Sequence, residues 1–250
     1  MIRERKALPE TVGALFDTAF GAFGRRIGLY AGIALGGFII QGAVAAALGL
    51  VHGQRELVSL TSILASVFID AFIMGVVTIG VVNDLAGDDP LSSRDIADAA
   101  MRRLLPLIGV NAVVAFTFVE TAGAVLLPSI VSFALLVLPI STLWAVMDFA
   151  TVVCAIEPGA GALLIALSVG KSFRLGLAAP NFGRTVLLGL VTLPPFLLQI
   201  VLFDQLQLRH VRGLDFWASV PIDAIAVGPI QAVFTVFYLD FVRRAAAAGR

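Results

Sequence analysis

Six apolar stretches, each long enough to cross a lipid bilayer, restrict what this sequence can fold into more than any other feature. Hydrocarbon offers the backbone no hydrogen-bond partner, so a crossing segment must be a helix or a strand of a closed barrel. Barrel strands have roughly 10 residues and alternate apolar with polar side chains, whereas these stretches are longer and do not alternate. The sequence therefore predicts an all-α integral membrane protein, a single polytopic domain over residues 1–250, with transmembrane helices at 27–51, 57–82, 105–127, 133–156, 185–203 and 216–241.

The distribution of basic residues predicts the orientation of these helices. If both termini are cytoplasmic, only Arg55, Arg209 and Arg212 of the 17 lysines and arginines fall in outer loops. Cytoplasmic loops of membrane proteins are enriched in Lys and Arg. We therefore expect a multi-pass protein of the bacterial inner membrane, built of three hairpins, with both termini cytoplasmic. A cleaved signal peptide ending near residues 43–45 is the alternative, but 26 residues precede the first apolar stretch, which does not fit the usual layout of a signal peptide.

A short amphipathic segment precedes each hairpin. In residues 8–24, apolar side chains recur at steps of three and four from Val12 to Phe23, which places them on one face of a helix. Segments 92–104 and 160–178 show the same periodicity, and we call all three elbow helices. An arginine lies at or after the end of each segment, and these three, Arg26, Arg103 and Arg184, are 77 and 81 residues apart. A nearly constant period of this kind predicts a threefold repeat of elbow helix and hairpin.

The elbow helices are expected to lie in the cytoplasmic interface, with apolar faces in the acyl chains and basic residues at the headgroups. The candidate ligands for lipid headgroups are Arg25, Arg26, Arg102, Arg103, Lys171, Arg174 and Arg184. The alternative is that these helices only anchor the chain and bind no particular lipid. In the first apolar stretch, Gly28, Gly32 and Gly36 have the spacing that permits two membrane helices to approach closely.

Four carboxylic acids lie inside the apolar stretches, where neither Lys nor Arg is present to pair with them. They are Asp70, Glu120, Asp148 and Asp223, each in a different stretch. An ionisable residue within a membrane is costly and often marks a route for protons or ions. From their positions in the stretches, the four would lie at two depths, separated by roughly 10 Å at the rise of an α-helix. The alternative is that each carboxyl is protonated or hydrogen-bonded to a neighbouring helix and only holds helices together.

Two groups of residues resemble a known family. One comprises Leu143-Trp144, Glu157-Pro158-Gly159, Ala166-Leu167-Ser168, Ser172-Phe173-Arg174-Leu175 and Asn181-Phe182-Gly183-Arg184; the other runs from Phe237 through Tyr238 and Asp240 to Arg244. They are similar to the membrane domain attached to some bacterial glycerophosphodiester phosphodiesterases and to its stand-alone six-span relatives, and the resemblance covers nearly the whole chain. The sequence departs from the family at Gly170-Lys171, where an Arg-Ser pair is usual. It also leaves no room for the family's barrel-shaped catalytic domain, which needs roughly 250 residues. The resemblance thus implies a fold, and it does not carry over an enzymatic activity.

Composition limits the remaining functions. The net charge is zero, so no basic field is available to bind nucleic acid. The single cysteine and two histidines do not form a recognisable metal signature, and we expect no catalytic residue, metal or cofactor. We expect a non-catalytic structural or accessory subunit that organises a membrane complex or its lipids, with membrane lipids and other integral membrane proteins as partners. The alternatives are a transporter of protons, cations or small solutes that uses the carboxyls, and a lipid-handling protein linked to glycerophosphodiester metabolism.

Overall fold

The computed structural model describes residues 8–52, 55–87, 91–125, 130–159, 161–208 and 214–248, and within these ranges the chain forms nine α-helices and no strand. The all-helical class is therefore confirmed for this part of the chain. Six helices are long: α2 (Ile27–His52), α3 (Arg55–Ala86), α5 (Leu104–Val125), α6 (Ile130–Ile156), α8 (Ala179–Leu208) and α9 (Leu214–Ala248). Three are short and precede a long one: α1 (Val12–Arg25), α4 (Ser93–Arg102) and α7 (Gly161–Gly176).

Local sequence explains where the short helices begin and end. The Thr11 side chain accepts a hydrogen bond from the backbone of Ala14 and begins α1. Ser92 and Asp95 form a reciprocal capping box at the start of α4, and these hydrogen bonds lower the pKa of Asp95. At the C-terminal end of α7, the Asn181 side chain donates to the carbonyl of Leu175 at 2.9 Å, so a residue of α8 satisfies a terminal carbonyl of α7. The elements are therefore separate helices joined by bends of 69° between α4 and α5 and 102° between α7 and α8.

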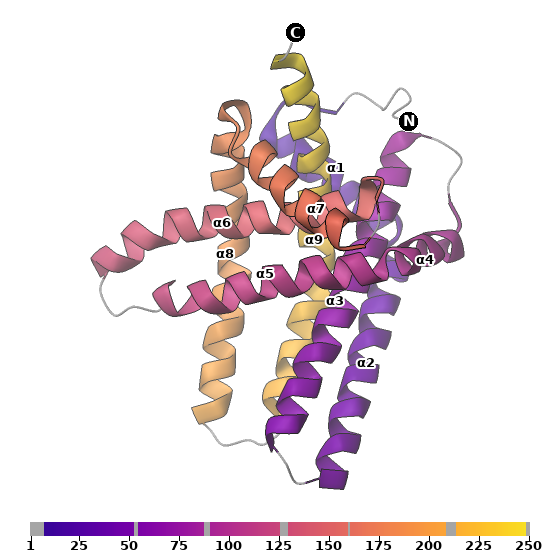
Figure 1. Cartoon of the computed structure of the whole chain (residues 1–250), viewed down its shortest axis with the longest axis vertical. Coiled ribbons are helices and arrows are strands. Elements are labelled where there is room, and N and C mark those ends of the chain that lie inside the picture. The colour runs from indigo at the N-terminus through magenta and orange to yellow at the C-terminus, as the bar shows by residue number, and fades with distance from the viewer. Residues whose placement is uncertain are drawn as a thin grey trace.

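The three hairpins do not all run in the same direction. Figure 1 shows α2, α3, α8 and α9 along the long axis of the molecule, while α5 and α6 lie across them. A glycine permits one of these crossings: a Cβ added to Gly189 of α8 would lie 2.2 Å from the carbonyl oxygen of Ser141 of α6. The two backbones therefore touch where they cross. By contrast, a Cβ at Gly28, Gly32 or Gly36 would meet no atom within 4 Å, so the expected close approach at these glycines is not observed in this chain.

The main hydrophobic core joins all three repeats. Phe149 of α6 lies with its ring centroid 5.1 Å from those of both Phe234 and Phe241 of α9. Phe16 of α1 lies 5.3 Å from Phe237 of α9 by the same measure. The apolar stripe of α1 is thus directed mainly into the protein. Leu15, Ala19 and Ala22 are buried, and only Phe20, 51% exposed, points clearly outward. The amphipathic pattern led us to expect this face in the acyl chains, whereas in the structure much of it packs on α9.

Length and hydropathy make a membrane protein plausible. Val67–Ala86 in α3 and Val137–Ile156 in α6 are each long and apolar enough to cross a bilayer. Among the residues that the structure describes, the count of such helices rises from two to four if each bent pair, α4 with α5 and α7 with α8, is a single broken span. The six expected spans coincide with the six long helices, but six crossings and an interfacial position for the elbow helices stay predictions.

Candidate functional site

One arginine in each repeat ties the beginning of a hairpin to its end. In each repeat, this arginine lies shortly after the end of the short helix: the three are Arg26, Arg103 and Arg184. Each donates hydrogen bonds to residues at the far end of the second long helix of its own repeat. The sequence separations of donor and acceptor are 58, 54 and 56 residues. Each unit of the repeat expected from sequence therefore contains one such contact at a similar sequence separation. We call these three the arginine contacts.

In the first repeat, the contact is an ion pair. Arg26 Nε donates to Asp84 Oδ1 at 2.9 Å, and this bond raises the pKa of the guanidinium. Asp84 is nearly buried, with its side chain 9% exposed. Arg26 Nη1 also donates to the backbone carbonyl of Leu91 at 3.0 Å, and Asn83 accepts from the backbone of the same Leu91. One arginine thus fixes the end of α3 and the segment that leads into α4.

In the second repeat, the arginine binds backbone instead of a carboxylate. Arg103 Nη1 donates to the carbonyl oxygens of Cys154 and Glu157, which end α6. The carboxylate of Glu157 remains available to other partners. Its Oε1 accepts from Lys171 Nζ at 2.5 Å and from the Tyr238 hydroxyl at 2.8 Å. Glu157 therefore joins α6 to α7 and α9.

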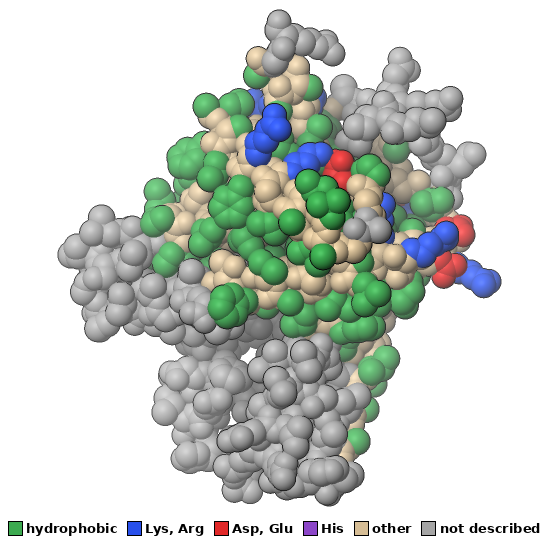
Figure 2. All heavy atoms as spheres, in the orientation of Figure 1, with side chains coloured by type: hydrophobic (Ala, Val, Ile, Leu, Met, Phe, Trp, Pro, Cys, Tyr) green, Lys and Arg blue, Asp and Glu red, His purple; other side chains and the backbone are tan. Residues whose placement is uncertain are grey.

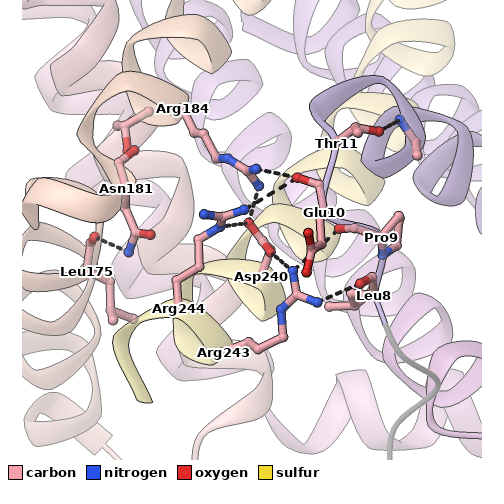
Figure 3. A network of polar contacts seen from close by, with 12 residues as sticks. Leu8, Pro9, Glu10, Thr11, Leu175, Asn181, Arg184, Asp240, Arg243 and Arg244 are labelled. Atoms are coloured by element: carbon pink, nitrogen blue, oxygen red, sulfur yellow. Dashed lines mark hydrogen bonds and ion pairs between the residues drawn. The ribbon is translucent and has the colours of Figure 1, made fainter. Parts of the chain in front are cut away.

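In the third repeat, three arginines converge on one buried acid (Figure 3). Asp240 of α9 is fully buried and pairs with Arg184, with Arg243 at 2.6 Å and with Arg244 at 2.8 Å. The same guanidiniums also donate to backbone carbonyls before α1: Arg184 to Glu10 and Arg243 to Leu8, both at 2.6 Å. The cluster therefore joins the N-terminal segment, the start of α8 and the end of α9.

A pocket of about 620 Å³ lies beside these contacts, between the end of α6, one face of α7 and the end of α9. Glu157, Lys171 and Arg174 contribute its charges, and its walls include Val153, Leu164 and Leu167. Its size is typical of a site for a small molecule or part of a larger amphiphile. Within the part of the chain that the structure describes, no three His, Cys, Asp or Glu side chains are placed to hold a metal ion.

The seven candidates for headgroup binding fall into two groups. The internal contacts described above involve Arg26, Arg103, Arg184 and Lys171, and Arg25 lies 3.6 Å from Asp84. The other two are exposed: Arg102 donates at 3.4 Å to a carbonyl of its own helix, and Arg174 makes no hydrogen bond or ion pair with any described residue. Arg174 is therefore the candidate whose charge is most available to a ligand.

Of the four carboxylic acids in the apolar stretches, the structure describes the side chains of two. Asp70 on α3 and Asp148 on α6 are both half-buried. No hydrogen bond or ion pair connects Asp148 to another described residue. The side chains of Glu120 and Asp223 lie outside the described part of the structure. The predicted proton or cation route therefore stays a prediction.

Sequence reasoning missed the acceptors of the arginine contacts. Asp84, Glu157 and Asp240 each follow or end the second apolar stretch of a repeat, so aligning the three repeats would have shown an acid at corresponding places. The search for site residues considered acids inside the apolar stretches and passed over these three, because acids at helix ends are ordinary surface residues in most proteins. The exposure of these side chains ranges from 0% for Asp240 to 32% for Glu157, and it cannot be read from the repeat.

No protein-family model, curated protein or solved structure matches this chain.

Proposed function

We propose that this chain is a non-catalytic membrane protein that organises a membrane complex or its lipids. In this proposal six helices cross the bacterial inner membrane, both termini are cytoplasmic, and the arginine contacts lie at the cytoplasmic side. The observation that carries the proposal is that the charged side chains at the hairpin ends bind one another and backbone carbonyls. Asp240, for example, has three guanidiniums around it and is fully buried, which suits a joint between helices and keeps this carboxylate from acid–base chemistry with a ligand.

We further propose a relation to the membrane domain found beside some glycerophosphodiester phosphodiesterases. The support is that residues carrying this resemblance contact one another although they are distant in sequence: Glu157 with Tyr238, and Arg184 with Asp240. Conserving such pairs would conserve the joints of the fold. The relation implies an architecture, and the hydrolytic activity of the attached domain is not part of the proposal.

Purification in a mild detergent, followed by mass spectrometry of the co-purifying proteins, lipids and pigments, tests this function. We expect the protein in the membrane fraction, with specific lipids or membrane proteins retained in constant ratio. The same preparation should not hydrolyse glycerophosphodiesters. Hydrolysis that survives repurification and disappears in a point variant would refute the non-catalytic assignment.

A further inference from the structure

The pocket between α6, α7 and α9 combines cations with apolar walls. Lys171 and Arg174 are three residues apart on α7, so their side chains lie on one face of that helix, and both line the pocket. Val153 from α6 and Leu164 and Leu175 from α7 provide apolar lining. A ligand that fills this space must therefore offer an anionic group to one part and hydrocarbon to another.

Charge at the pocket favours an anion. Glu157 is already bound to Lys171 at 2.5 Å, so its negative charge is compensated, whereas the Arg174 guanidinium is exposed and unengaged by described residues. Ala245 of α9 also lines the pocket; it directly follows Arg243 and Arg244, which share Asp240 with Arg184 outside the pocket lining. A phosphate would meet an excess of positive charge here, and guanidinium donors suit its oxygens.

The surroundings of the pocket indicate where the hydrocarbon comes from. Leu163 and Leu167 of α7 are 70% and 55% exposed, and Phe182 at the start of α8 is 48% exposed. Figure 2 shows hydrophobic side chains over much of this face, with Lys and Arg side chains close to its upper edge. An apolar surface bordered by cations is the pattern of an interface with anionic lipid.

We propose that this pocket binds an anionic phospholipid, with the phosphate at Arg174 and Lys171 and an acyl chain along the apolar wall of α7. This inference rests on the proposed function, because it requires α7 to lie at the membrane surface, and it names the ligand that the protein would organise. A polar headgroup without acyl chains would leave the lining residues Leu167, which is 55% exposed, and Leu175, which is half-buried, uncovered, so a free phosphate or glycerol phosphate is not the expected occupant.

The binding test uses the full-length protein in detergent and measures the rise in its thermal unfolding midpoint as lipid is added, since a ligand of the folded state stabilises it. Phosphatidylglycerol is compared with phosphatidylcholine of the same acyl chains and with glycerol 3-phosphate. We expect phosphatidylglycerol to bind about fivefold more tightly than phosphatidylcholine, the factor appropriate to one basic residue at an anionic lipid surface. Glycerol 3-phosphate should leave the midpoint unchanged.

Two variants address the pocket without removing an internal contact. Arg174→Gln removes the unengaged cation and should weaken phosphatidylglycerol binding about fivefold. Gly170 lines the pocket, and a Cβ there would meet no atom within 4 Å, so Gly170→Leu should occupy part of the pocket and weaken binding with every charge in place. Arg102→Gln is the matched control, because it removes an exposed arginine from another short helix and should leave the affinity unchanged.

Equal binding of the two phospholipids would overturn the proposal, as would equal losses in Arg174→Gln and Arg102→Gln. A full response to glycerol 3-phosphate would identify a small-anion site and refute the assignment to lipid. These outcomes are distinct from failure of the proposed function, which would appear as a protein absent from the membrane fraction. A protein that inserts normally yet ignores lipid charge would lose only this inference.

Discussion

Replacing Asp240 with asparagine should destabilise the protein more than any other single charge removal at the hairpin ends. The substitution keeps the shape of the side chain but removes the carboxylate that three arginines share. Removing one partner of a fully buried ion pair costs about 3–5 kcal/mol, because the other charge remains uncompensated. Here the side chains of Arg184, Arg243 and Arg244 are 16%, 39% and 30% exposed, so water can partly compensate them. We therefore expect a loss of about 2–3 kcal/mol.

Thermal unfolding in detergent measures this loss. For a chain of this size, a change of that magnitude corresponds to a decrease of roughly 5–10 °C in the unfolding midpoint. Asp98→Asn is the matched control, because Asp98 is 58% exposed and its ion pair with Arg94 is 3.9 Å long. Such a surface pair contributes only about 0–1 kcal/mol. Adding Arg244→Gln to Asp240→Asn should recover part of the lost stability, because it removes one of the uncompensated cations.

Two results would refute this reasoning. If Asp240→Asn unfolds at the wild-type temperature, the acid does not hold the cluster together. If Asp98→Asn is equally destabilising, the effect reports net charge and not the buried contact.

Three further predictions concern packing and transport. Gly189→Ala should lower stability by about 1–3 kcal/mol because its methyl group meets the α6 backbone. Gly32→Ala should be neutral or slightly stabilising because its methyl group meets no neighbour. Unfolding midpoints in detergent compare the two variants, and equal effects would mean that α6 and α8 do not touch at Gly189. Thr78→Val removes the acceptor, 2.8 Å away, of the buried Gln231 amide and should lower stability in the same assay by about 1 kcal/mol, so an unchanged midpoint would mean that this bond does not join α3 to α9. Asp70→Asn should leave the fold intact, and neither it nor the unmutated protein should conduct protons or cations in proteoliposomes; a current that Asp70→Asn abolishes would establish the transporter instead.

Sequence periodicity predicted the helices well, since both the apolar runs and the amphipathic stripes are local features. The threefold repeat was also visible, because Arg26, Arg103 and Arg184 recur at similar intervals. The direction of the helices was not predictable in the same way. Spans of similar length suggest a parallel bundle, but the crossing of α5 and α6 depends on contacts between distant segments (Figure 1).

The candidate site was predicted only in part. Lys171 and Arg174 are among the seven candidate headgroup ligands, but which of the seven basic residues remain exposed depends on tertiary partners that sequence does not show. The glycines illustrate the same limit: spacing drew attention to Gly28, Gly32 and Gly36, whereas Gly189, which has no such partner in sequence, lies against another backbone. Whether two helices approach closely at a glycine depends on the helix that faces it, and a single sequence does not show which helix that is.

Labelling of single cysteines tests most directly the central claim that each repeat places one hairpin across the membrane. In a Cys154→Ser background, cysteines replace Gln54, Ser129 and His210, one in each predicted outer loop, and Asp88 on the predicted inner side; all four positions lie outside the described residues. We predict that a membrane-impermeant thiol reagent added from the periplasm labels the first three and not the fourth. Labelling at Gln54 and His210 without labelling at Ser129 would show that the α5–α6 hairpin does not cross, and would contradict the six-span repeat.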